Sequence, residues 1–210
     1  MDANRLAPLS GVAAAALIVG SQAAAGTPPG SDAPASEVVS YYVEHDTGQI
    51  AAAALLSLGA LLVLVFAATL VTVLRRGAAA SGPVVLLLSG AVVLVAGLTI
   101  FAGLSLMLGD LAGQVDDSTL RSIHVISQEL FFPVTVGASA FFLGAGFAAL
   151  RTGVLPRWLG WAALVLGVVS AIPSHVLGGF LDHIGYVGFI GLCGWMLVVG
   201  VLLAVRGAGT

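Results

Sequence analysis

An acidic residue at the edge of a long apolar run is the first candidate for chemistry. Glu129 precedes the segment LFFPVTVG, with Pro133 one helical turn later. An ionisable residue in a membrane span is a functional candidate because lipid disfavours its charge. Pro133 has no N–H group, so it leaves the Glu129 carbonyl without its helical donor and predicts a kink. We expect the Glu129 side chain to face the bundle interior beside this kink, near the outer interface, where Arg121 or His183 could stabilise its charge.

Other polar residues extend this candidate site. Arg121, His124 and Gln128 are spaced i, i+3, i+7, so they form one stripe of a helix that leads to Glu129. The loop between the last two apolar runs adds imidazole and carboxylate groups on the same side. Because such groups ligate divalent metals, the candidate metal or ligand residues are His124, Glu129, His175 and His183, with Arg121, Gln128 and Asp182 in support.

Two interpretations of these residues stay open. Their spacing matches no metal motif such as HExxH or CxxC, and the sequence holds no phosphate loop or nucleophile elbow. One interpretation is an outer-face site for a divalent metal or a small molecule, which could belong to an enzyme. The other is that the histidines are solvated and that Glu129 pairs with Arg121 or with a neighbouring helix.

The composition places the chain in a membrane. Of its 210 residues, 59% are hydrophobic and only 8% are charged, whereas about a quarter of a soluble domain is charged. Too few polar side chains exist to cover a water-facing surface, so the lipid bilayer is the expected partner. The seven basic residues are scattered arginines, which excludes a nucleic-acid surface. The single cysteine, Cys193, excludes an internal disulfide and a multi-cysteine metal site.

Apolar runs define the predicted architecture, since a span needs about 20 such residues. The runs lie at about 6–25, 50–74, 84–108, 126–150, 158–178 and 184–205. We therefore predict an all-α, polytopic transmembrane bundle of six spans that forms one domain over residues 1–210. The first run also resembles a signal peptide, because Arg5 precedes it and three alanines end it. We favour a retained helix, because the run is long enough to fill a span.

A short helix is expected between the first two spans, over about residues 36–46. Ser36 can cap it, and Val38, Tyr41, Tyr42 and His45 are spaced i, i+3, i+4, i+7 on one face. Tyrosines on such a face often lie at the level of the lipid headgroups. We predict an interfacial helix resting on the outer membrane surface, with a lid over a ligand site as the alternative.

The arginines predict the orientation. If the loops alternate sides, all of them except Arg121 fall on one side of the membrane. Loops rich in arginine stay in the cytoplasm, so both termini are expected there. The histidines and most acidic residues then lie outside or near the outer interface.

Small residues predict how the helices pack, because close backbone contact drives helix association in lipid. Ala140, Gly144 and Ala148 recur at every fourth residue of the fourth span. In the sixth span a glycine recurs at every third residue. That step lags the helical period by about 60°, so the glycine line drifts around the helix. The structural residues we select are Pro133, Gly185, Gly188, Gly191 and Gly194.

The stretch LFFPVTVGASAFFLGAGFAALRTGVLPRWLGWAALVLGV resembles an uncharacterised family of bacterial integral membrane proteins with a domain of unknown function. RLAPLSGV, SEVVSYYVEH and the segment Leu-Pro-Arg-Trp-Leu-Gly-Trp fit the same family. The resemblance implies a six-helix bundle without an assigned activity, and it transfers no catalytic residues. With the predicted topology, it implies a multi-pass protein of the bacterial plasma membrane.

Three functions are compatible with these observations. The favoured one is a non-catalytic membrane protein that acts through outer-face or lateral contacts with a membrane-protein partner or a second copy. The second is an outer-face protein that binds a divalent metal or a small molecule. The third, a small transporter, is less favoured because the predicted spans carry no ionisable group or broken helix pair at mid-membrane.

Overall fold

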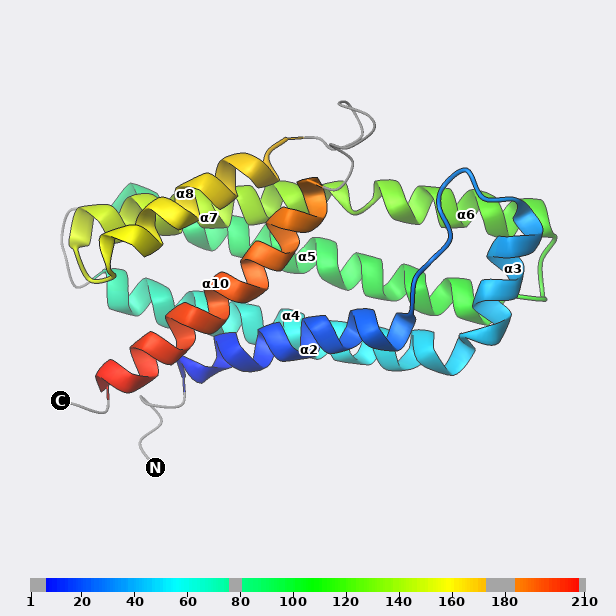
Figure 1. Cartoon of the computed structure of the whole chain (residues 1–210), viewed down its shortest axis with the longest axis horizontal. Coiled ribbons are helices and arrows are strands. Elements are labelled where there is room, and N and C mark those ends of the chain that lie inside the picture. The colour runs from blue at the N-terminus through cyan, green and yellow to red at the C-terminus, as the bar shows by residue number, and fades with distance from the viewer. Residues whose placement is uncertain (1–6, 76–80, 173–183, 208–210) are drawn as a thin grey trace.

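The computed structural model describes residues 7–75, 81–172 and 184–207, and the regular structure in these ranges is entirely helical. This confirms the predicted all-α class. Figure 1 shows how the helices are arranged. In chain order they are α2 (Leu9–Ala25), α3 (Ala35–Glu44), α4 (Asp46–Leu74), α5 (Ser81–Leu111), α6 (Asp117–Glu129), α7 (Phe132–Thr152), α8 (Arg157–Ser170) and α10 (Ile184–Gly207).

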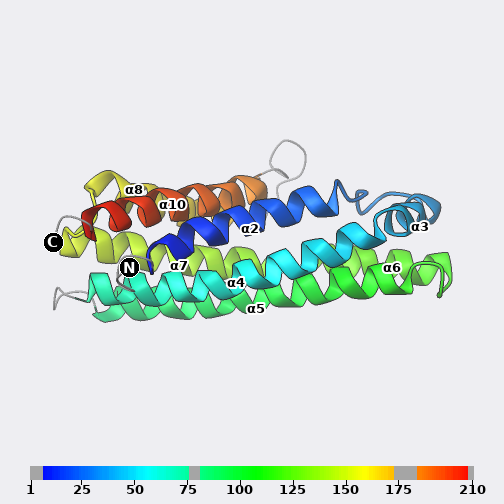
Figure 2. The same cartoon turned by 90° about the horizontal axis from the view of Figure 1, so that it is seen from below.

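The six apolar helices form a closed ring. Each packs against the next one along the chain, in the order α2, α4, α5, α7, α8, α10, and α10 closes the ring against α2. Figure 2 shows α8 and α10 on one side of this bundle and α4 and α5 on the other. An even number of alternating helices brings the start of α2 and the end of α10 to the same end of the molecule (Figure 1).

Within the described ranges, four stretches are long and apolar enough to cross a membrane: α4, α5, the α6–α7 pair and Val187–Arg206 of α10. The other two ring helices, α2 and α8, are apolar but shorter, with 17 and 14 residues. Large apolar side chains such as Val92, Val168 and Ile190 remain exposed on the ring. Helices that are apolar on all sides are typical of a bundle solvated by lipid. The chain is therefore a helical membrane protein.

The helices differ in extent from the predicted apolar runs. The first run was expected from residue 6, but α2 begins at Leu9. The fifth was expected to continue to residue 178, but α8 ends at Ser170 and residues 173–178 lie outside the described ranges. At about 1.5 Å per residue, α4 and α5 are about 44 and 46 Å long. Both exceed the ~30 Å hydrocarbon core, because their far ends support the short helices α3 and α6.

Glycine produces the closest helix contact, between α5 and α7. A Cβ atom at Gly90 would overlap the backbone at Phe141, and one at Gly144 would overlap the backbone at Leu87. Gly137 lies against Leu94 in the same way. The sequence pattern had selected Gly144 and its neighbours Ala140 and Ala148, but not the glycines of α5. Backbone contact of this kind is what small residues permit in membrane bundles.

The glycine line of α10 serves the contact with α8 only in part. A Cβ atom at Gly188 would meet Ser170, and one at Gly191 would overlap the Leu166 side chain. At Gly194 a Cβ atom would meet nothing within 4 Å among the described residues, so this glycine makes no close contact with them. The drift of about 60° per three-residue step turns this position away from α8. The surroundings of Gly185 lie outside the described part of the structure.

Aromatic rings fill the centre of the bundle. Trp195 of α10 lies edge-on to Phe66 of α4 and to Phe141 and Phe142 of α7, with ring centroids 5.8–6.4 Å apart. Its indole N–H donates to the Leu159 carbonyl of α8 at 3.1 Å. The four side chains therefore close the middle of the ring.

The helix that leads into the membrane is interrupted where the sequence predicted a kink. α6 ends at Glu129 and α7 begins at Phe132, with Pro133 in its first turn. Pro133 cannot donate to the Glu129 carbonyl, so the hydrogen-bonding ladder stops there. The break separates a polar helix from an apolar one: α6 carries Asp117, Arg121 and His124, whereas α7 is about 31 Å long and fits the bilayer.

Candidate functional site

A separate layer covers the end of the bundle opposite the termini. We call it the cap and define it as α3, α6 and residues 26–34. In Figures 1 and 2, α4, α5 and α6 continue past the ends of α8 and α10 to reach α3. A small apolar core joins the cap to α5: it is made of the cap residues Ala33, Val38, Tyr41, Tyr42 and Leu120 together with Leu108 of α5. The predicted short helix is therefore present as α3, and its aromatic face is buried against α5 and α6.

The start of α6 is fixed by a capping residue. The Asp116 carboxylate accepts hydrogen bonds from the Thr119 amide at 2.9 Å and from the Thr119 hydroxyl at 2.8 Å. The hydrogen bond from the Ser118 hydroxyl, followed by those from Thr119, lowers the pKa of the Asp116 carboxyl to about 2. A charged side chain that accepts the orphan amides of the first turn stabilises the helix end.

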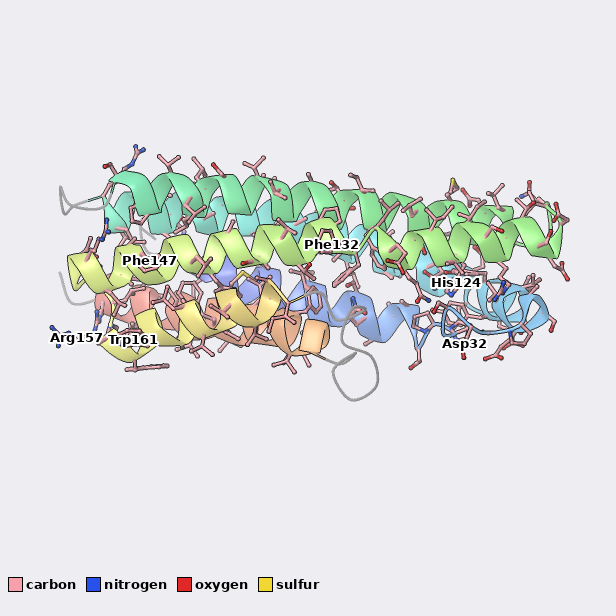
Figure 3. All side chains as sticks on the ribbon, turned by 90° about the horizontal axis from the view of Figure 1, so that it is seen from above. Asp32, His124, Phe132, Phe147, Arg157 and Trp161 are labelled. Carbon is pink, nitrogen blue, oxygen red and sulfur yellow. The ribbon has the colours of Figure 1, made fainter. Side chains whose placement is uncertain are left out.

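His124 links the three parts of the cap. Its Nδ1 lies 2.9 Å from the Tyr42 hydroxyl of α3, and its Nε2 lies 3.1 Å from the Pro29 carbonyl. Gln128 Nε2 lies 2.8 Å from His124 Nε2 and donates to the same Pro29 carbonyl at 3.0 Å. Figure 3 shows His124 on α6 pointing toward the other two parts. Only 1% of the residue is exposed, and this burial lowers the imidazole pKa, with the Pro29 carbonyl acting in the opposite direction.

Arg121 binds the loop of residues 26–34 rather than Glu129. Its Nε donates to the Ala33 carbonyl at 2.8 Å, and its Nη2 donates to the Ser31 carbonyl at 3.4 Å. The guanidinium therefore binds the backbone just before α3. This assigns Arg121 a structural role that its position in a polar stripe could not reveal.

Glu129 does not face the bundle interior, and that expectation was wrong. Its side chain is exposed, whereas His124 on the same helix is buried. Five residues turn a helix by about 140°, so these two side chains lie on different faces. The predicted stripe of Arg121, His124 and Gln128 does come together, but on residues 26–34 and α3 rather than around Glu129.

The remaining predicted ligands lie outside the described ranges. They are His175, Asp182 and His183. Within the described ranges, no group of three or more His, Cys, Asp or Glu side chains could hold a metal ion. The metal site built from both sets of residues therefore stays a prediction.

A second cluster of polar side chains, separate from the His124 contacts, lies where α2, α3 and α4 meet. The Tyr41 hydroxyl donates to the Ala25 carbonyl at 2.7 Å, and Gln49 Nε2 donates to the Tyr41 hydroxyl at 2.9 Å. The His45 ring stacks on Tyr41, with centroids 4.7 Å apart. Gly26, which ends α2 at a φ of 77°, lies against His45. This left-handed backbone favours glycine and turns the chain toward the cap.

A pocket of about 60 Å³ lies beside this second cluster of polar side chains. It is lined by α2, α4 and α5 and by the cap residues Gly26, Pro28, Tyr41 and Tyr42. Sequence reasoning had noted the two tyrosines but missed Gln49, which is buried near the start of α4. The sequence offered one signal for this residue, which is an amide side chain one turn inside a long apolar helix.

The two ends of the molecule carry charges of opposite sign. The described acidic residues are all exposed and belong to the cap or to the ends of α4 and α5 beside it: Asp32, Glu37, Glu44, Asp46, Asp110, Asp116, Asp117 and Glu129. Four arginines, Arg75, Arg151, Arg157 and Arg206, lie at helix ends that face the other way. Figure 3 shows this division with Asp32 at the cap end and Arg157 at the opposite end.

Trp161 lies at the arginine end, near Arg157 (Figure 3), and Trp158 directly follows Arg157 at the start of α8. Trp158 and Trp161 are 60% and 61% exposed. Exposed tryptophans near a helix end are typical of a membrane interface. Trp195, in contrast, is buried in the ring.

Comparisons with known proteins identify a family but assign no activity. No curated protein and no solved structure matches the chain. A family model described as "Domain of unknown function (DUF4386)" matches residues 8–200, which include the whole cap and nearly all of the ring. The chain therefore belongs to the DUF4386 family.

Proposed function

We propose that the protein crosses the bacterial plasma membrane six times, with both termini in the cytoplasm and the cap outside. The arginines at the terminal end of the bundle support this orientation, because positively charged loops stay in the cytoplasm. The ring supports a retained first helix, since Ala14, Ala15 and Ile18 of α2 are buried in the common core.

The function that the geometry supports best is recognition at the outer face. We infer a non-catalytic protein whose cap contacts another protein. The observation that carries this proposal is the cap itself, a folded layer with an apolar core shared with α5 and eight exposed carboxylates on and around it. Arg121, its one described arginine, is bound to backbone carbonyls.

The negative charge of the cap indicates which kind of partner it would bind. A second copy presenting the same acidic face would be repelled, whereas a basic surface would be attracted at long range. The partner is therefore a protein with a basic patch that is exposed at the outer face, such as a neighbouring membrane protein.

The aromatic centre of the ring argues against the transport alternative. Phe66, Phe141, Phe142 and Trp195 lie where a conduction path would run, and the first three are fully buried. A path for ions or polar solutes needs polar groups or water at mid-membrane. Recognition of a partner protein by the cap requires no such path.

The proposal can be tested by cross-linking in intact cells. A photoreactive amino acid at Asp117 should give a discrete adduct, because this residue is exposed on the cap. The same amino acid at Val165, which is exposed on α8 in the ring, is the control. The adduct should be lost in the triple variant Glu37→Gln, Glu44→Gln, Asp110→Asn. An adduct that survives this neutralisation, or that forms equally at Val165, would contradict recognition by the acidic cap.

A further inference from the structure

The pocket under the cap has a defined chemistry. One wall is apolar and includes Ala52, Leu56 and Phe101. The polar side chains of the lining are Ser21 and Gln22 of α2, Tyr41 and Tyr42 of α3, Gln49 of α4 and Ser105 of α5. Its volume of about 60 Å³ is several times the ~10–15 Å³ that one ordered water requires on the same measure. The space therefore suits a small organic molecule.

Gln22 is exposed to solvent. The hydrogen atoms of the other polar side chains are already in use: the Ser21 hydroxyl donates to the Ile18 carbonyl at 2.7 Å, and the Tyr42 hydroxyl lies 2.9 Å from His124 Nδ1. The Tyr41 hydroxyl donates to the Ala25 carbonyl, and the Ser105 hydroxyl donates to the Phe101 carbonyl at 3.0 Å. The Gln49 amide nitrogen donates to the Tyr41 hydroxyl and, at 3.5 Å, to the Ala25 carbonyl. The lone pairs that remain can only accept hydrogen bonds.

Gln49 has an unused acceptor at this site. The residue is 3% exposed and lines the pocket. Its Oε1 accepts no hydrogen bond from the residues that the structure describes, although both bonds from Nε2 are made. The Tyr41 hydroxyl gives its proton to Ala25, so the Gln49 nitrogen must face it, and this fixes the amide orientation. Unlike Ser170 Oγ, which is buried without a partner, this oxygen stays accessible, so a donor in the pocket can reach it.

Among the residues that the structure describes, the lining carries no charged side chain. A cation placed there would lose its hydration without gaining a counter-charge. The part of the ligand inside the pocket is therefore neutral, with a donor at one end and an aliphatic part that contacts Ala52, Leu56 and Phe101.

We propose that this pocket binds an uncharged group that presents a hydroxyl on a short aliphatic chain, with the hydroxyl donating to Gln49 Oε1. The same chemistry occurs in free small alcohols and polyols and in the terminal glycerol of phosphatidylglycerol, whose anionic phosphate would stay outside the pocket. The proposal goes beyond the recognition of a protein by the cap and does not depend on it.

A photoreactive alcohol tests the site directly. The full chain in phosphatidylcholine nanodiscs is irradiated with 2-(3-methyldiazirin-3-yl)ethanol, and labelled residues are mapped by mass spectrometry. Labels should gather on Tyr41 and on residues 49–56. The methyl ether of the same probe lacks the donor, so it should label these residues about five-fold less, which is the loss expected for one hydrogen bond.

Three variants locate the binding. Gln49→Met removes the acceptor and should reduce labelling by the alcohol to the level of the ether. Ala52→Leu should abolish labelling by filling the space. The Ser105 hydroxyl bonds only within α5, so Ser105→Ala should leave the fold intact and weaken labelling. Ser122→Ala removes a similar hydroxyl from the exposed face of α6 and should change nothing.

Competition identifies the source of the hydroxyl. Reduced labelling when phosphatidylglycerol replaces part of the phosphatidylcholine, at a level where free glycerol has no effect, points to a lipid headgroup. Reduced labelling by glycerol alone points to a free molecule.

Two outcomes would overturn the proposal. Equal labelling by the alcohol and the ether would show that the donor is irrelevant. Absence of label at the pocket from both probes would show that it holds only water. Neither result depends on the cross-linking of the cap, so the two proposals can fail separately.

Discussion

His124 connects three segments of the chain through one imidazole. Tyr42, Pro29 and Gln128 all lie within hydrogen-bonding distance of its two ring nitrogens. In either neutral tautomer one ring nitrogen accepts a hydrogen bond, and protonation removes that acceptor. A buried imidazole is also harder to charge than one in water. The cap is therefore built around the neutral form of His124.

The first prediction is that acid loosens the cap. The pKa of His124 is lower in the docked cap than its usual value near 6.5, so the undocked state binds more protons between these two values. Docking is fully stabilised above about pH 6.5 and loses stability as the pH falls toward the lowered pKa. Hydrogen exchange of residues 35–44, corrected for the intrinsic pH dependence, should be faster at pH 5 than at pH 7.5.

His124→Phe is the control for this prediction. The substitution keeps a ring of similar shape but has no proton to gain. It should give weaker protection of α3 at pH 7.5 and no further loss at pH 5. Equal protection of α3 in the unmodified protein at both pH values would contradict the role assigned to His124.

The second prediction concerns Glu129. Because its side chain is exposed, Glu129→Gln should leave the thermal unfolding midpoint in detergent unchanged, as is usual for exposed charges. Metal analysis of the purified proteins provides an independent measurement. A stoichiometric divalent metal that is lost in Glu129→Gln would instead establish the site predicted from His124, Glu129, His175 and His183.

At the scale of the helices, packing depends on which small residues lie at a contact. Gly90 and Gly144 let α5 and α7 meet through their backbones, while Gly188 and Gly191 let α10 approach α8. The periodicity of glycine in the sequence indicates that close contacts exist. It cannot say which partner each glycine meets, because that depends on the rotation of both helices.

The third prediction uses two glycines of α10 that are three residues apart. Gly191→Leu should destabilise the bundle by about 1–3 kcal/mol, the usual cost of over-packing, because its side chain would overlap Leu166. Gly194→Leu should cost little, since Gly194 is exposed. Thermal unfolding of both variants in detergent makes the comparison. Equal midpoints would mean that the packing of α10 against α8 is wrong.

Pro133 illustrates what the sequence could predict at this scale. The missing N–H is a local property, so the break between α6 and α7 followed from the residue type alone. The direction of the Glu129 side chain did not follow, because it depends on how α6 docks. Tyr42 and Pro29, which hold the buried face of α6, are 82 and 95 residues from His124 along the chain.

At the scale of the whole molecule, composition decided the class and apolar runs located the helices. The short helix α3 was also predictable, because its apolar and aromatic residues share one face. The ring order and the pocket were not predictable. Both arise from contacts between distant helices, such as Gln49 with Tyr41 and Ala25, and a single sequence carries no signal for such pairs.

The central claim is that a six-span bundle carries a folded cap on the outer face of the membrane. Single cysteines placed at Ser31 and Asp117, in a background without Cys193, test it most directly with a membrane-impermeant maleimide. Both positions are exposed on the cap, while Thr152 lies at the opposite end of α7. We predict labelling of Ser31→Cys and Asp117→Cys in intact cells, and labelling of Thr152→Cys only after permeabilisation. The reverse pattern would contradict the orientation and, with it, the outer-face function.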